Sequence, residues 1–384
     1  MKSFIIVFLS FITCYSQELT KTELLKNVKS FTLDTINYKI EGDGFEFLKQ
    51  EINQNQYFLM GEYHNSSLVS KLTQSLFPYL KNANYNVWIT EISPTSVKKL
   101  NSFLDSDDFT KKITDFNKKY GKNNSPIPFF SSQADYEMLL TSRKNNFELW
   151  GLDQHYFGGF QFVIDDTYNS LDAQTKAKYP TLIEDSKKQG DEGDKAFMKI
   201  FDLSKNKLAK KIKAEMLASA SIYGDYSAGN YFENNTVRST LMKTNFYNYY
   251  NDFTNKYKKD PKAFFKFGSN HMAKGVSPIG IMDLGDCINQ MATLKNQKSL
   301  HVQLCYRYEK EKNEMIDRLN SGVYPVELLE LYKEDNWIVL DLRPFHAKLY
   351  NLQLKKDAKI EFSKEMIECI KQFDILILSP EKVK

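Results

Sequence analysis

Cysteine is scarce in this sequence of 384 residues, and the few present follow no recognisable spacing. They are Cys14, Cys287, Cys305 and Cys369. So few cysteines, with three of them after residue 16, exclude a dense disulfide framework. One disulfide with a free thiol and three separate thiols both remain open. Because the spacings match no zinc-binding pattern, a structural zinc module is also excluded.

Long hydrophobic runs are equally scarce, and the most prominent one lies at the N-terminus. Phe4–Ile12 is an apolar run of nine residues, about half the ~20 that a membrane-spanning helix needs. Lys2 precedes this run, and Cys14 and Ser16 are small residues at positions −3 and −1 of a cleavage site. This pattern predicts a signal peptide at residues 1–16 and an exported, periplasmic or extracellular protein. A poor lipobox argues against a lipid anchor on Cys14, and no integral membrane span is expected.

An excess of one charge is also missing, since 52 Lys and Arg residues face 48 Asp and Glu residues. A surface this close to neutral gives no electrostatic reason to expect nucleic-acid binding. Hydrophobic residues make up 42% of the chain and aromatic residues 14%, which excludes general disorder.

Short apolar runs alternate with helical patterns along much of the chain. Several runs are apolar at consecutive positions, as in buried parallel strands, and the order strand, helix, strand predicts an α/β fold. We expect a mainly parallel sheet flanked by helices, in one domain spanning residues 17–384. Helical periodicity predicts an insertion or cap at about residues 160–260, and polar composition predicts a surface loop at 105–130. The expected strands are 56–60, 86–90, 147–152, 263–267, 279–284, 300–306, 337–342 and 373–378.

Ionisable residues follow four of the expected strands. In an open parallel sheet the ligand crevice lies beyond the carboxyl ends of the strands, so distant residues can meet there. We therefore expect one cleft at this sheet edge, roofed by the helices of 160–260. The residues at the four strand ends are Glu62 with His64, Glu91, Asp153 with His155, and His271.

Each candidate has a functional and a structural interpretation. Glu62 and His64 point to the same side of an extended segment, so they could form a general base, bind a metal, or merely cap the next helix. Glu91 follows a buried strand, where a carboxylate needs a partner unless it begins a helix. His271 follows a glycine turn and could be a surface residue. Arg238 lies on a buried helical stripe, where it either snorkels to solvent or meets an anion.

Several common catalytic motifs are absent from the sequence. It has no G-x-S-x-G elbow, no H-E-x-x-H helix, no glycine-rich dinucleotide loop and no P-loop. The commonest serine hydrolases, zinc peptidases and nucleotide-binding enzymes are thereby excluded.

The ordered set of motifs resembles the erythromycin esterase/ChaN-like superfamily, which includes the Tiki and TraB-type proteins. The resemblance rests on Gly61-Glu62-Tyr63-His64, a strand ending in Glu91 about thirty residues later, and the segments 151–153, 237–242 and 267–271. It implies an α/β fold and different activities by branch, namely lactone hydrolysis, metal-dependent peptide hydrolysis or haem binding. The positions that carry over are Glu62, His64, Glu91, Arg238 and His271.

One departure from the esterase pattern matters. That branch usually has G-E-x-x-H-G, whereas one residue separates Glu62 from His64 here. The resemblance therefore favours a hydrolase acting on an ester, lactone or amide, with a small-molecule or peptide substrate, over a macrolide-specific enzyme. His64 would be the general base, oriented by Glu62 or Glu91, with Arg238 and His271 stabilising an oxyanion.

Three alternatives stay open from the sequence. A divalent metal held by Glu62, His64 and His271 could activate the water. Haem or another ligand could be bound without turnover, which needs only one axial ligand and an apolar slot. A degenerate member of the fold would have a structural or interaction role.

Overall fold

The computed structural model describes residues 18–121, 125–188, 190–311, 314–355 and 359–382. The predicted signal peptide and Cys14 lie outside these residues. No helix within them is long and apolar enough to cross a membrane. Cys287, Cys305 and Cys369 are all free thiols, which decides the question that the sequence left open.

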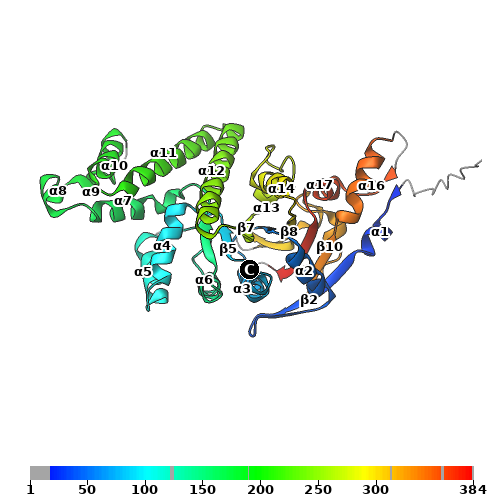
Figure 1. The fold of residues 1–384 in the computed structure, drawn as a ribbon. Coiled ribbons are helices and arrows are strands. Elements are labelled where there is room, and N and C mark those ends of the chain that lie inside the picture. Colours follow the sequence, from blue (N-terminus) through cyan, green and yellow to red (C-terminus); the bar gives the residue numbers. More distant parts are fainter. Residues whose placement is uncertain (1–17, 122–124, 189, 312–313, 356–358, 383–384) are drawn as a thin grey trace, which may run out of the picture.

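A large twisted sheet forms the centre of the described chain (Figure 1). Its strands run in the order β3-β2-β10-β12-β8-β4-β7-β5-β6, and β9 pairs with β8 outside this path. A separate pair joins β1 (Glu18–Leu19) to β11 (Lys359–Ile360). The strands of the large sheet are β2 (Val28–Asp34), β3 (Lys39–Glu41), β4 (Tyr57–Glu62), β5 (Val87–Thr90), β6 (Glu148–Gly151), β7 (Ala263–Gly268), β8 (Ser299–Glu311), β9 (Glu314–Asp317), β10 (Trp337–Asp341) and β12 (Ile375–Lys382).

The half of the sheet from β12 to β6 is entirely parallel, whereas β10, β2 and β3 are antiparallel additions at the other edge. The expectation of a mainly parallel α/β fold is confirmed. Side chains along a strand alternate between its faces. Phe58 and Met60 of β4 therefore join one core layer, and Tyr57 and Leu59 join the other. Burial on both faces explains why this strand is apolar at consecutive positions.

Helices cover both faces of the sheet (Figure 1). One face packs against α2 (Asp43–Gln54), α3 (Ser67–Asn82) and α6 (Gln133–Lys144). The other packs against α14 (Leu284–Leu294), α16 (Arg343–Gln353), α17 (Lys364–Gln372) and the long α12 (Tyr231–Tyr257). The remaining helices of this part are α1 (Lys21–Leu25), α4 (Pro94–Leu104), α5 (Phe109–Tyr120), α13 (Ser269–Met272), α15 (Val326–Leu329) and the 3₁₀ turns Phe157–Gly159 and Arg318–Asn320.

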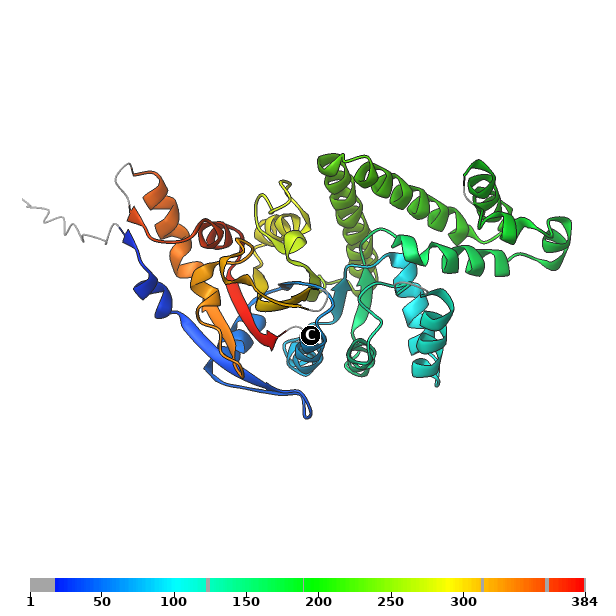
Figure 2. The same cartoon turned by 180° about the vertical axis from the view of Figure 1, so that it is seen from behind.

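The helical insertion expected from the sequence is present. It begins with α7 (Phe160–Asn169), α8 (Ala173–Lys178), α9 (Leu182–Asp185), α10 (Asp191–Leu203) and α11 (Lys207–Ser227), and it returns to the sheet along α12. Figures 1 and 2 show α7–α11 projecting sideways beyond the β6 edge as an arm. The roof expected from the sequence is limited to the end of α11 and the start of α12, which border the site at the strand ends.

Two other local expectations were wrong. Residues 105–130 are not one long loop, because Phe109, Ile113 and Phe116 form the buried stripe of α5. The lysines between them hid this period. Residues 279–284 are not a strand, because only an isolated bridge joins Val276 to Met282 before α14 begins.

Candidate active site

The carboxyl ends of β4, β5 and β7 bring the five carried-over residues together. Glu62 is the last residue of β4, and His64 lies two positions beyond it. Glu91 directly follows β5, and His271 lies in α13 just after β7. Arg238 reaches the same place from the first half of α12. The parallel registers between β4, β7 and β5 align these strand ends, so the chain positions that are far apart in sequence meet.

Glu91 is the centre of the cluster and is only 4% exposed. Its Oε2 accepts a hydrogen bond of 2.6 Å from the backbone N–H of Gly268 and lies 3.3 Å from His64 Nε2. Its Oε1 lies 2.7 Å from Arg238 Nη2 and 3.4 Å from His271 Nε2. Burial would raise the pKa of Glu91, but the two histidines outweigh it and hold the pKa well below its usual range.

His64 lies between two carboxylates. Its Nδ1 is 3.1 Å from Glu62 Oε1, and its ring stacks on Phe129 with 3.9 Å between ring centroids. Burial lowers the pKa of His64, but the charge of Glu91 and the hydrogen bond to Glu62 outweigh burial and raise the pKa to about 9. The side chain is still 26% exposed, so it is the member of the cluster most accessible to a small reactant.

Lys266 is a buried cation that the sequence analysis did not single out. It belongs to β7, and its Nζ donates a hydrogen bond of 2.6 Å to Glu62 Oε1. Although burial alone would raise the pKa of Glu62, Lys266 and His64 lower it. A lysine inside the apolar run Phe264-Phe265-Lys266-Phe267 was the available signal, because a buried ammonium requires a carboxylate partner.

Arg238 does not snorkel to solvent. Its Nε and Nη2 donate to both oxygens of Asp153, at 2.9 and 2.6 Å, and Nη2 also contacts Glu91. Burial opposes the charged form, but Asp153 and Glu91 raise the pKa of Arg238 further, so the guanidinium is a fixed cation. No described residue accepts a hydrogen bond from its Nη1.

His271 is held more tightly than His64. Its Nδ1 is 2.7 Å from Asp283 Oδ2, its Nε2 faces Glu91, and its side chain is 8% exposed. Burial lowers its pKa, and Glu91 and Asp283 overcome this and the repulsion from Arg238 to raise the pKa to about 9. Asp283 was missed because it was assigned to a strand, whereas it caps α14 through the backbone N–H of Leu284.

The charges of the cluster balance in one protonation state. The carboxylates of Glu62, Glu91, Asp153 and Asp283 face the cations of Lys266 and Arg238 and the two imidazoles. Neutrality therefore requires both histidines to be protonated. Removing one proton leaves a net negative charge in a site that is largely shielded from water, which is the physical basis of the raised pKa values.

The donor set does not fit the metal that the sequence left open. Among the residues described, no three His, Cys, Asp or Glu side chains are arranged to hold a metal ion. Glu62 Oε1 is already occupied by Lys266 and His64. Haem fits these histidines no better, because both rings are protonated in the neutral cluster and a protonated imidazole has no lone pair for iron.

The other histidines have structural contacts. His155 is 1% exposed, and its Nδ1 lies 3.0 Å from Ser93 Oγ, outside the cluster. Of the two residues at that strand end, Asp153 is the one that joins the cluster, through Arg238. His301 lies within β8 and hydrogen-bonds Met272 O, as expected for a packing residue, and His346 contacts Phe373 O.

Two adjoining cavities open onto the cluster. One, of about 660 Å³, is lined by His64, His271, Gly268, Gln303 and Tyr324 among others. The second, of about 650 Å³, extends toward α11 and α12. They share Asn65, Glu91, Phe129 and Arg238, so both reach the same reactive groups.

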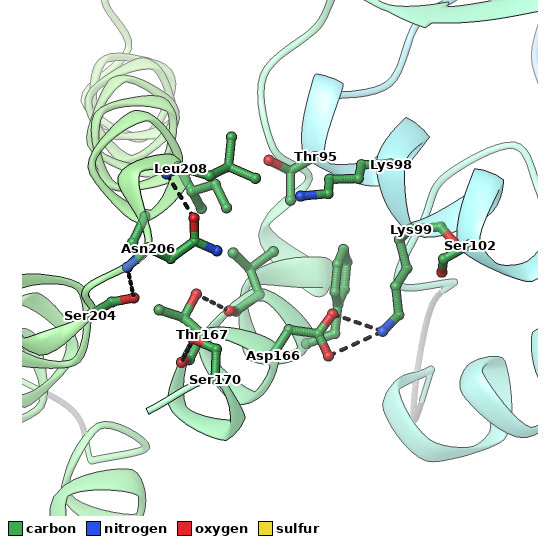
Figure 3. Close-up of a pocket in the computed structure, with 14 residues that line it drawn as sticks. Thr95, Lys98, Lys99, Ser102, Asp166, Thr167, Ser170, Ser204, Asn206 and Leu208 are labelled. Atoms are coloured by element: carbon green, nitrogen blue, oxygen red, sulfur yellow. Dashed lines mark hydrogen bonds and ion pairs between the residues drawn. The ribbon is translucent and has the colours of Figure 1, made fainter. Parts of the chain in front are cut away.

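A smaller pocket of about 240 Å³ lies in the helical arm, away from these residues (Figure 3). Lys99 of α4 is paired with Asp166 of α7 at 2.7 Å, and Thr167 donates to the backbone of its own helix. Its lining contains no histidine and a single carboxylate, Asp166, which is paired with Lys99, so this pocket offers no comparable chemistry.

Comparison with solved structures supports the resemblance at the level of fold. A mutant of the erythromycin esterase EreC in its open conformation matches with a TM-score of 0.57 and 13% identity over 93% of this chain and 98% of that one. A Bacillus cereus protein matches with a TM-score of 0.54 and 10% identity over 94% and 97%. A succinoglycan biosynthesis protein matches with a TM-score of 0.52 and 15% identity over 94% and 96%.

Sequence comparisons give no further assignment. No protein-family model matches the chain. No curated protein matches it significantly in sequence. At these identities the structural likeness concerns architecture, and the chain shares the fold of the erythromycin esterase structure over nearly its whole length.

Proposed function

We propose that the protein is an exported hydrolase in which His64 activates water against an ester, lactone or amide bond. The observation that carries the proposal is the position of His64, an accessible imidazole that lies between Glu62 and Glu91 and lines the first cavity. A histidine paired with a carboxylate is the usual arrangement of a general base, because the carboxylate orients the ring and stabilises the imidazolium that forms.

The two contacts of the ring differ, and the difference identifies the reactive nitrogen. Nδ1 hydrogen-bonds Glu62 at 3.1 Å, whereas Nε2 is 3.3 Å from Glu91, beyond the usual range for such a bond. In the neutral ring Nδ1 keeps its proton for Glu62, and Nε2 has a lone pair. A water in the cavity beside Nε2 and Glu91 can donate one hydrogen to each, which directs its oxygen toward the substrate carbonyl.

The reaction then needs a cation at the carbonyl oxygen and a proton for the leaving group. Nε2 takes one proton from water as the oxygen attacks, and Nη1 of Arg238 donates to the developing oxyanion. The imidazolium returns its proton to the departing alcohol or amine. His271 was assigned to the oxyanion from the sequence, but its contacts with Asp283 and Glu91 favour a role in positioning Glu91.

The test is turnover of a panel of nitrophenyl esters, lactones and peptide amides by the mature chain. His64→Ala should lower kcat by roughly 10²–10⁴-fold, the usual contribution of a general base. His346→Ala is the matched control, because His346 lies outside the cluster. Equal activity of His64→Ala and the parent protein on a hydrolysed substrate would refute the assignment of the base.

Export is tested separately from chemistry. The sequence pattern places the cleavage site after Ser16, so N-terminal sequencing of secreted protein should begin at or near Gln17. Recovery of the protein in the cytoplasm with Met1 retained would contradict export and leave the proposed reaction unaffected.

A further inference from the structure

The second cavity is large enough to hold a part of the substrate beyond the reacting bond. Its walls are the loop at residues 125–131, the loop after β6, the end of α11 and the start of α12. It shares Phe129, Glu91 and Arg238 with the cavity that contains His64. A group bound there would therefore be attached to a carbonyl lying near His64.

Aromatic rings form much of the wall of this cavity. Phe129, Tyr156, Tyr223 and Tyr226 line it. Phe157 braces two of them, with ring centroids 4.6 Å from Tyr156 and 5.6 Å from Tyr223. Tyr226 is 60% exposed, so its ring is accessible. Aromatic faces of this kind bind flat C–H surfaces and cations.

Carboxamides supply the polar part of the wall. Oε1 of Gln154 is buried and has no hydrogen-bond partner. Asn234 uses its Nδ2 to bond Ile222 O at 2.6 Å, and no described residue hydrogen-bonds the side chains of Asn65 and Asn235. An unpaired buried acceptor costs about 1–3 kcal/mol unless a ligand or water donates to it. Because carboxamides both donate and accept, they suit hydroxyl groups, which do the same.

The charged groups of the wall are paired with one another. Glu91 and Asp153 both contact Arg238, at 2.7 and 2.6 Å. The other lining residues are uncharged. A charged ligand would therefore have to compete with these ion pairs, whereas an uncharged ligand would not.

We infer that the second cavity binds an uncharged saccharide ring, as the glycosyl part of the substrate of the proposed hydrolase. A sugar ring has an apolar C–H face for the tyrosines and a rim of hydroxyls for the amides. That the ring is part of the substrate rests on the proposed function. That the cavity binds the ring does not.

Binding is tested without turnover on the full mature chain carrying His64→Ala. Saturation-transfer NMR would use millimolar glucose, galactose, N-acetylglucosamine, maltose and cellobiose, with tetramethylammonium and cyclohexanol as charged and apolar comparators. At least one saccharide should receive saturation more strongly than both comparators. Failure of every saccharide, or stronger binding of either comparator, would overturn the inference.

Variants locate the binding. Tyr226→Ala should weaken the affinity for the bound saccharide about 3- to 10-fold by removing a stacking face. Gln154→Met, which preserves side-chain volume, should weaken it by a similar factor by removing the unpaired acceptor. Tyr247→Ala is the matched control, because Tyr247 is 64% exposed on α12 and does not line the cavity. Equal loss in Tyr247→Ala, or no loss in the other two, would contradict the location.

Kinetics separates the inference from the function on which it rests. The parent protein should hydrolyse a 4-nitrobenzoate ester of the bound sugar with higher kcat/KM than ethyl 4-nitrobenzoate, and Tyr226→Ala should remove that preference. Hydrolysis of both esters without preference would overturn the saccharide site and leave the hydrolase standing. Saccharide binding without hydrolysis of any ester would refute the proposed hydrolase and leave the saccharide site standing.

Discussion

Two neighbouring clusters hold their histidines in opposite protonation states. The cleft cluster at the strand ends contains His64 and His271, and the His301 cluster, within and beside β8, contains His301, Asp374 and Lys274. His64 and His271 have pKa values of about 9 because, although burial opposes the charged form, each lies between carboxylates. Burial lowers the pKa of His301 to about 4. Its ring nitrogens contact a backbone carbonyl and a hydroxyl, Met272 O and Ser299 Oγ.

The difference shows that the partner decides the state of a buried imidazole more than burial itself. Met272 follows His271 in the chain, so the two environments are adjacent. Asp374 is the carboxylate of the His301 cluster. It accepts hydrogen bonds from Lys274 and from the backbone N–H of His301, and not from the His301 ring. A neutral ring that is fixed on both sides serves packing, whereas a charged ring beside a cavity can exchange its proton with a substrate.

The largest difference between the two clusters is expected when the central carboxylate of each is substituted. Glu91→Gln leaves Arg238 and two histidines without their common anion, so the free energy of unfolding should fall by about 3–5 kcal/mol. Asp374→Asn is the matched control, because Asp374 is 5% exposed and also lies among buried polar groups. It should cost only about 1–2 kcal/mol, since its amide can still accept a hydrogen bond from His301.

Denaturant unfolding of both variants at neutral pH measures this difference. Comparable losses in the two variants would show that the cleft cluster is an ordinary buried network. The interpretation of Glu91 as the common anion of Arg238 and the two histidines would then be incorrect.

The pH dependence of turnover should be the next largest effect. With a pKa of about 9, only about 1% of His64 is neutral at pH 7, so kcat/KM should rise about tenfold per pH unit and level off near pH 9. Glu62→Gln removes one of the contacts that raise this pKa, and it should move the midpoint to lower pH. A profile with a midpoint near 6.5 in the parent protein would exclude the charged resting state of His64.

The sequence predicted where the cleft lies, but it did not predict all of the residues that form it. Glu62, His64, Glu91 and His271 follow apolar runs, and the parallel sheet rule places such residues at one edge. Lys266 and Asp283 were missed because neither follows a strand. Lys266 lies inside a strand, where it resembles an interruption, and Asp283 caps a helix whose start was taken for a strand.

Some of the fold was also beyond the sequence patterns. The stripe of α5 was hidden by exposed lysines, so composition suggested a loop. The direction of the helical arm depends on contacts between distant elements, because α11 packs on α12 and α12 packs on Trp150 and Phe265. Local periodicity identifies those helices but does not specify which face of the sheet they return to.

The lysine partners provide a finer comparison of the two clusters. Lys266→Met leaves Glu62 buried without its ammonium, so the free energy of unfolding should fall by about 2–3 kcal/mol at neutral pH. Lys274→Met should cost less, about 1 kcal/mol, because Lys274 is 23% exposed and water can replace it. A double variant with Glu62→Gln should regain part of the loss in Lys266→Met, and strictly additive losses would contradict the pairing.

The last prediction is a pair of opposite pH dependences of stability. The pKa values of His64 and His271 are raised above the unfolded value of about 6.5, so their contribution is complete below that pH and is lost as the pH rises through 9. The pKa of His301 is lowered to about 4, so its contribution is present above pH 6.5 and is lost as the pH falls through 4.

Each histidine should change the free energy of unfolding by roughly 3 kcal/mol at most, measured by denaturant titration from acid to alkaline pH. His64→Gln should remove its share of the alkaline limb, leave the share of His271, and leave the acid limb intact. The acid limb combines the titration of His301 with that of the carboxylates. His301→Asn should remove only the contribution of His301. Because each variant is compared with the parent at every pH, titration of the carboxylates common to both cancels. Loss of the alkaline limb in His301→Asn, or its persistence in a variant lacking both cleft histidines, would show that the charge of the imidazoles does not distinguish the two clusters.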